Sequence, residues 1–239
     1  MGNNSSQPDI DKAAVEKAAE DPVLISLRRA LATSASTHLE DVGRVLYTEG
    51  YVIGTDRATG KSPFGHGSDE TVAVSLIALI ASELTACIAE LFEKGKCYAA
   101  SALLRQMVEL EYLAWAFDTR NRDAERWIRS NSKERQDFFR PSKLRDAASG
   151  LFRGKDYGYH CDLGGHPTPT ALILLRNDAT TSQMLLSDLL GHVLGIWNHI
   201  VRWARQNGND RVEALNATIT PQFVEWKARD PLTELPPPP

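Results

Sequence analysis

The stretch YAASALLRQMVELEYLAWAF, from Tyr98 to Phe117, decides the fold of this chain. At 100° per residue, its apolar side chains cover almost the whole circumference of a helix, which is typical of a helix buried among others. Four polar residues nevertheless interrupt this pattern. They are spaced by four, four and three positions, so they lie along one line of the helix. This line, the polar seam, consists of Ser101, Arg105, Glu109 and Tyr112.

The polar seam needs partners, because a charged pair on a buried helix is costly unless other groups match it. Arg105 precedes Glu109, which is the weaker order for an ion pair within one helix. Arg105 has donors to spare for a loop carbonyl or an anion, and Tyr157, Tyr159 and His166 are the candidates to meet it. The seam either fastens their segment to the bundle or lines a phosphate pocket, with Arg105 binding the anion and His166 as acid or base.

The other helical signals predict an all-α fold. Ser68 caps a helix that runs to about Lys94, Gly95 ends it, and the central helix follows as the second arm of an antiparallel hairpin. Since no long stretch alternates with a period of two, we expect a bundle of about four long helices plus short peripheral helices. Other helices are expected at about 9–20, from Pro22 past His38, and at 118–139, 170–175, 179–206 and 211–217, with a further packed segment at 221–227 and loops at 54–67 and 150–169.

Length and composition indicate a single globular domain. The 239 residues are 42% hydrophobic and 24% charged, which is ordinary for a protein with a sizeable core. Residues 1–8 are expected to be a disordered leader, 9–230 one all-α domain with its core at 68–206, and 231–239 a disordered Pro-rich tail. The three cysteines form no metal-binding pattern and predict a cytoplasmic protein. The apolar run from Val72 to Ala81 is too short to span a bilayer.

Charge is distributed unevenly along the chain. The net charge is −4, but the segment from Arg120 to Lys155 holds eleven basic and five acidic residues. That segment is therefore +6 and the remainder is −10. Such asymmetry indicates either a site for phosphate or nucleic acid, or a solvated helix face.

Motifs for metal and nucleotide chemistry are incomplete. No Glu has a His three residues later, so the ligand pairs of di-metal bundles are missing. His160, Cys161 and His166 could ligate zinc, but a structural zinc site takes four ligands and no second cluster supplies the rest. Gly60 to Ser62 resembles the end of a P-loop, but the spacing from Gly54 is one residue too long. We expect neither a metal nor a cofactor.

The last long helix carries a polar line opposite its apolar stripe, and the default for such a line is a solvated face. Gly191 and Gly195 lie beside it, four positions apart. Because Gly costs about 1 kcal/mol relative to Ala inside a helix, the pair indicates that another backbone comes close there, from a loop or a second subunit. The polar line consists of Asp188, His192, His199 and Arg202.

The order of LLRQMVELEYLAWAF, an Arg-rich helix, a Tyr-x6-His-Pro segment from Tyr159 to Pro167 and a long last helix resembles a group of uncharacterised bacterial helical proteins related to the HEPN superfamily. The resemblance spans about 68–206 and implies a helical bundle that forms homodimers. Many HEPN domains are metal-independent ribonucleases of toxin–antitoxin and phage-defence systems, and others are inactive. Their signature, Arg followed after four to six residues by His, is matched by Arg153 and His160.

The chemistry implied by this resemblance is RNA cleavage without metal, in which the ribose 2′-OH attacks, a His of near-neutral pKa moves the proton and an Arg stabilises the phosphorane. Two alternatives remain open: a non-catalytic interaction module whose seam only fixes the fold, and a small-molecule binder. The candidate catalytic residues are Arg153, His160 and His166, and the candidate binding residues are Arg105, Glu109, Tyr112 and Tyr159.

Overall fold

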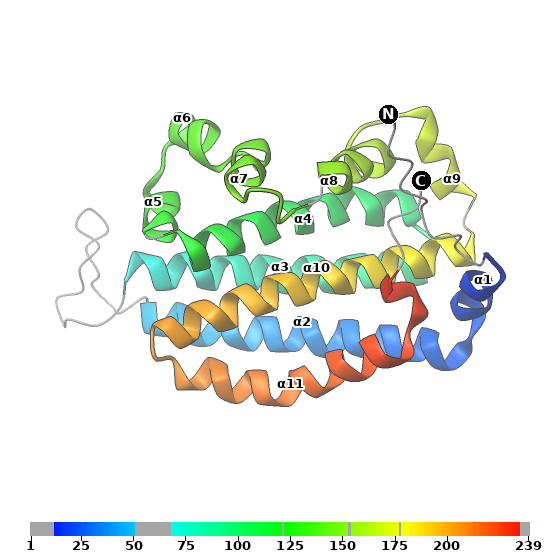
Figure 1. Ribbon diagram of the computed structural model, residues 1–239, viewed down its shortest axis with the longest axis horizontal. Coiled ribbons are helices and arrows are strands. Elements are labelled where there is room, and N and C mark those ends of the chain that lie inside the picture. Colours follow the sequence, from blue (N-terminus) through cyan, green and yellow to red (C-terminus); the bar gives the residue numbers. More distant parts are fainter. Residues whose placement is uncertain (1–11, 51–67, 121, 153, 177, 235–239) are drawn as a thin grey trace, which may run out of the picture.

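The computed structural model describes residues 12–50, 68–120, 122–152, 154–176 and 178–234. Within these ranges the chain is a bundle of helices without a β-strand, which confirms the predicted fold class (Figure 1). The predicted leader at 1–8 and the predicted loop at 54–67 lie outside the described residues. The long helices are α2 (Pro22–Gly50), α3 (Asp69–Glu93), α4 (Cys97–Thr119), α10 (Ala179–Gln206) and α11 (Asp210–Arg229).

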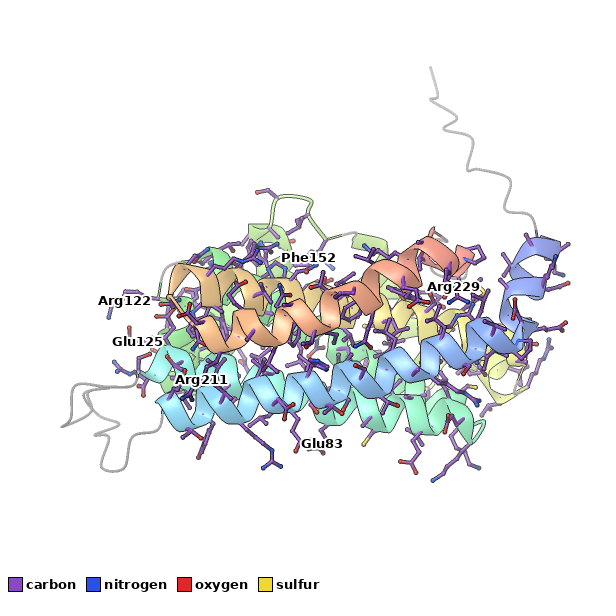
Figure 2. The ribbon with its side chains drawn as sticks, turned by 90° about the horizontal axis from the view of Figure 1, so that it is seen from below. Glu83, Arg122, Glu125, Phe152, Arg211 and Arg229 are labelled. Carbon is purple, nitrogen blue, oxygen red and sulfur yellow. The ribbon has the colours of Figure 1, made fainter. Side chains whose placement is uncertain are left out.

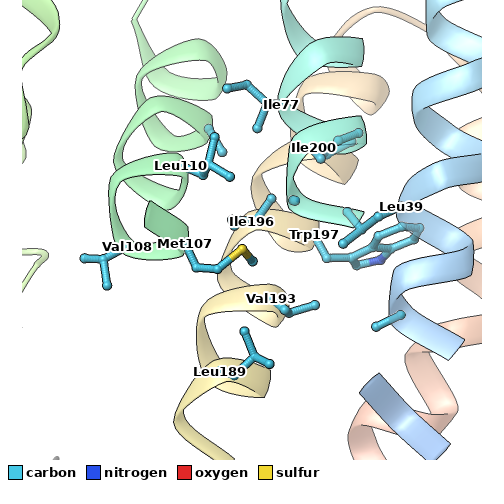
Figure 3. Packing of buried hydrophobic residues seen from close by; sticks show 14 of the residues in the cluster. Leu39, Ile77, Met107, Val108, Leu110, Leu189, Val193, Ile196, Trp197 and Ile200 are labelled. Carbon is cyan, nitrogen blue, oxygen red and sulfur yellow. The ribbon is translucent and has the colours of Figure 1, made fainter. Parts of the chain in front are cut away.

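Helix α4 is enclosed by other helices, as its all-round apolar pattern predicts. It packs on α3 and α10 on one side and on shorter helices on the other, while α2 and α11 complete the bundle below (Figure 1). Between them lies a continuous core in which Met107 of α4 approaches Val193 of α10, while Trp197 of α10 and Leu39 of α2 fill its far side (Figure 3).

Two helices, α3 and α10, are long and apolar enough to cross a membrane by length and composition alone. Their most apolar windows are 56% and 61% buried inside the bundle, respectively. In this structure the apolar side chains of α3 and α10 therefore pack mostly against neighbouring helices.

The predicted boundaries of the long helices are confirmed where a local capping signal exists. Ser68 caps α3, because its side chain accepts a hydrogen bond from the N–H of Thr71 at 3.1 Å. Gly95 has a φ of 65°, the left-handed conformation that lets α4 begin directly after α3. Asp178 caps α10 in the same way as Ser68, at 2.9 Å from the N–H of Thr181.

The single helix predicted at 118–139 is wrong, because the chain turns twice within it. Arg122 has a φ of 66°, which no helix interior allows. Asn131 and Glu134 then form a reciprocal capping box that starts a new turn. The pieces are α5 (Asp123–Arg129), α6 (Ser132–Glu134) and the π-turn η1 (Arg135–Phe139), and a separate helix, α7 (Pro141–Ala147), follows them.

The loop predicted at 150–169 is also largely helical. Leu163 is buried, and Gly164 lies so close to α4 that a Cβ there would sit 2.5 Å from the backbone N of Ala102. Burial against α4 thus outweighs the weak helix propensity of a Gly-rich segment. Within the predicted loop lie α8 (Gly154–His160) and the π-turn η2 (Cys161–Gly165). The 3₁₀ turn η3 (Pro169–Ala171) and α9 (Leu172–Leu175) follow, where the short helix at 170–175 was predicted.

Helix α11 replaces the short helix predicted at 211–217 and the separate segment predicted at 221–227. Pro221 lies inside it and is exposed, so its ring faces solvent. Ile219 and Phe223, on either side of Pro221, are both buried in the core. Their packing keeps the helix continuous despite the backbone hydrogen bond that Pro removes.

A buried ion pair joins the two ends of the described chain. The guanidinium of Arg28, in α2, donates to both carboxylate oxygens of Asp230, each at 2.7 Å, and neither side chain is exposed. Gln183 and Trp226 add hydrogen bonds to the pair. Part of the predicted disordered tail is consequently ordered, as the turn η4 (Pro231–Glu234), beside which α1 (Lys12–Glu20) also packs.

Candidate functional site

The polar seam of α4 meets helix α8. Arg105 donates through Nη2 to Oε1 of Glu109 at 2.8 Å and to the hydroxyl of Tyr157 at 3.0 Å. The hydroxyl of Tyr157 in turn donates to the same Glu109 oxygen at 3.1 Å. The prediction that the segment before α10 meets the seam is therefore confirmed, through Tyr157. The Arg105 and Glu109 side chains remain 29% and 33% exposed, respectively.

The other predicted binding residues are Tyr112, which is buried beneath α8, and Tyr159, which lies on α8 itself and is partly buried. Tyr112 is 1% exposed, and its ring packs on Phe152 with centroids 4.4 Å apart. The hydroxyl of Tyr159 is buried, and desolvation, followed by the charge of Asp188, raises the pKa of this phenol. Among the described residues, both the ring of Tyr112 and the hydroxyl of Tyr159 are therefore shielded from solvent.

Of the three predicted catalytic residues, the two that the structure describes, His160 and His166, have different surroundings. Arg153 lies outside the described residues. His160 is 1% exposed, and burial, followed by the charge of His192, lowers its pKa to about 3. His166 is exposed, and its backbone N–H donates to the carbonyl of Cys161. His160 is therefore neutral near pH 7 and enclosed, which does not suit a residue that must pass a proton to an RNA phosphate.

His160 instead belongs to a group of four side chains from three helices, the histidine–carboxylate cluster. Nε2 of His160 lies 3.3 Å from Oδ2 of Asp188, and Nε2 of His192 lies 3.7 Å from Oδ1 of Asp188. Nδ1 of His192 lies 2.7 Å from Oε2 of Glu111. The cluster therefore connects α8, α10 and α4 through His160, Asp188, His192 and Glu111.

The solvated face predicted for α10 is wrong for both of its histidines. The His192 side chain is 14% exposed, and His199 is buried with its Nδ1 3.0 Å from Oδ2 of Asp118. Burial lowers the pKa of His199, and its hydrogen bond to Asp118 opposes this shift. Within this chain, the group that comes close to Gly195 is a side chain and not a backbone, because a Cβ there would sit 2.1 Å from Oε1 of Glu111, whereas nothing in the described residues lies within 4 Å of a Cβ at Gly191.

A hollow of about 720 Å³ opens at the end of α4 and α10, beyond His199. Arg202 at its edge donates to Asp118 at 2.7 Å, and Gln206 donates to the other oxygen of the same carboxylate. Charges of both signs thus neutralise one another on its wall, and the hollow offers little net field to a charged small molecule. Its lining residues include Glu70, Asp118, Arg120, Arg202 and Gln206.

The basic segment forms a separate layer above α4, made of α5, α6, η1 and α7 (Figure 1). Within this basic layer the guanidinium carbon of Arg126 lies 3.5 Å from the ring centroid of Phe138, which is 39% exposed. Some of its arginines are paired, since Arg122 and Glu125 lie together at the end of the bundle with 3.2 Å between them (Figure 2). Both charged and aromatic groups are therefore exposed on one layer.

The chain matches no known protein family, no curated protein and no solved structure. The resemblance to HEPN-related proteins accordingly stays a prediction.

The reasoning from sequence missed the histidine–carboxylate cluster. It grouped His160 with its neighbours in the chain, whereas the partners of His160 are 28 and 32 positions away on α10. Asp188 and His192 are four apart on one helix face, and that spacing, with Gly195 one turn later, was the available signal.

Proposed function

We propose that this chain binds single-stranded RNA through the basic layer and does not cleave it. The observation that carries the proposal is the exposed ring of Phe138 beneath the guanidinium of Arg126, within the most basic segment of the chain. Exposed aromatic rings beside arginines are surfaces on which unpaired bases stack. Sequence-tolerant binding of single strands uses this combination of stacking and phosphate contacts.

Charges available to phosphate groups support the same proposal. Lys133, Arg140 and Lys143 are exposed and form no ion pair with any residue in the described ranges. Arg129, in contrast, is paired with Asp69 at 2.5 Å. A cation without a carboxylate partner can neutralise an RNA phosphate and release its counterions, which is the main source of affinity in such complexes.

Binding is favoured over cleavage because of the position of His160. Its ring is enclosed between α8 and α10, and its pKa of about 3 keeps it neutral. The exposed cations of the basic layer lie on other elements, at 133–143. Homodimer formation, the cytoplasmic location and a role in toxin–antitoxin or phage-defence systems stay predictions.

The test is fluorescence anisotropy of a labelled single-stranded RNA at increasing salt. Three phosphate contacts, at a slope of about −0.7 each, predict an affinity loss of about twentyfold between 50 and 200 mM salt. The double charge reversal Arg140→Glu with Lys143→Glu should weaken binding more than tenfold and reduce the salt slope. Lys227→Glu is the matched control, because Lys227 is also exposed but lies on α11.

Two outcomes would contradict the proposal. Absence of binding at low salt, or equal weakening by Lys227→Glu, would favour the interaction module with a structural seam. RNA fragments that accumulate in EDTA in proportion to enzyme concentration would restore the ribonuclease hypothesis.

A further inference from the structure

The histidine–carboxylate cluster has the donor atoms of a metal site. One ligand atom each from His160, Asp188 and His192 lies within 4.8 Å of the other two. Metal–ligand distances of about 2.0–2.2 Å require donor atoms about 3.0–3.5 Å apart around one ion. The observed separations of 3.3 Å and 3.7 Å to the two oxygens of Asp188 are close to that range. Small side-chain rotations would therefore complete the coordination.

One buried nitrogen of the cluster forms no hydrogen bond with a described residue, although a carboxylate oxygen lies 3.3 Å away. Nε2 of His160 makes no hydrogen bond, although the ring is 1% exposed and the atom faces Asp188. Buried polar atoms are normally satisfied, and an exception indicates a missing water, ion or ligand. A neutral imidazole presents a lone pair at this nitrogen, which is the form that binds a metal.

Glu111 orients the second imidazole. Its carboxylate lies 2.7 Å from Nδ1 of His192, which leaves Nε2 of that ring directed at Asp188. Hydrogen bonding of the distal ring nitrogen to a carboxylate is the usual support of a metal-binding His. The glycine at 195 makes room for this carboxylate, since any Cβ there would overlap Oε1 of Glu111.

We propose that Nε2 of His160, the carboxylate of Asp188 and Nε2 of His192 bind one divalent transition-metal ion, with Glu111 as the positioning residue of His192. Two imidazoles and one carboxylate suit Zn²⁺ and Fe²⁺ better than Mg²⁺ or Ca²⁺, which prefer oxygen ligands alone. Three protein ligands leave at least one coordination position for water. The site replaces the expectation that the chain holds no metal, and it is independent of RNA binding by the basic layer.

The experiment is a zinc titration of the full chain after removal of metals with a chelator. We expect one Zn²⁺ per chain by competition with a chromogenic chelator, and a rise in melting temperature on addition of zinc. Replacement by Co²⁺ should give visible absorption bands from nitrogen and oxygen coordination. Asp188→Asn and His192→Gln keep the side-chain volume and should each weaken zinc binding more than tenfold, while Glu111→Gln should weaken it about 10–100-fold.

The matched controls are Cys161→Ser and His166→Gln, which alter the other potential ligands near His160 in the sequence. Both should bind zinc like the unaltered chain. Absence of stoichiometric zinc binding, or its loss in these controls rather than in Asp188→Asn, would overturn the proposal and leave the cluster as a structural network. Circular dichroism of each variant before the titration shows that a loss of binding does not reflect unfolding.

Discussion

Glu111 and Gly195 oppose each other across the contact between α4 and α10, and a Cβ at 195 would lie 2.1 Å from Oε1 of the glutamate. The carboxylate that occupies this space also holds His192 at 2.7 Å. A single glycine therefore determines whether the histidine–carboxylate cluster can form.

Gly195→Ala should displace Glu111 and lower the free energy of unfolding by about 1 kcal/mol, because loss of a charge-assisted hydrogen bond of about 2 kcal/mol exceeds the gain in helix propensity. Zinc affinity should fall with it. Gly191→Ala is the matched control, since nothing lies within 4 Å of its added Cβ, and it should stabilise the helix by up to about 1 kcal/mol. Urea denaturation measures both, and equal effects of the two substitutions would contradict the assignment.

Tyr157→Phe should loosen α8 without disturbing the core. The substitution removes the hydroxyl that connects Arg105 and Glu109, at a cost of about 1 kcal/mol for a partly exposed group. Hydrogen exchange should become faster at 154–160 while α10 stays protected. Tyr98→Phe serves as control, because Tyr98 forms no hydrogen bond with a described residue. Unchanged exchange in α8 would mean that the seam does not fasten this helix.

Stability should fall on acidification partly through His199. Burial lowers its pKa in the folded state, so below about pH 6.5 the unfolded state binds the proton more readily and gains stability. The charged groups around this ring are Asp118, Arg202 and Glu111. The melting temperature of His199→Gln should therefore decline less steeply than that of the unaltered chain as pH falls from 7 to 5. Parallel curves would exclude this contribution.

Removing one partner of the buried ion pair should be strongly destabilising. Arg28→Met or Asp230→Leu leaves an uncompensated charge where neither side chain is exposed, which costs about 3–5 kcal/mol. The double variant should lose much less than the sum, because two apolar groups of similar volume can pack together. Additive losses in chemical denaturation would show that the ion pair does not couple the two positions.

The sequence predicted those parts of the fold that depend on local signals. Ser68 and Gly95 act within one turn of chain, and α3 and α4 begin and end beside them. The segments at 118–139 and 150–169 were misjudged because their conformation depends on tertiary burial, as Gly164 against the backbone of α4 illustrates. The same distinction between local and distant partners applies to the candidate site. Arg105 and Glu109 share one helix and were found, whereas the partners of His160 come from a distant helix and were not.

The bond between Arg28 and Asp230 spans 202 residues, and this separation constrains the order in which the protein can be completed during synthesis. A ribosome that has already produced α2, α3 and α4 has yet to make the carboxylate that neutralises Arg28. Until then the guanidinium has, among the described residues, only the carbonyl of Ala18 and, later, the amide of Gln183 as partners, so its charge stays uncompensated in this part of the bundle. Closure waits for Asp230 to emerge from the exit tunnel.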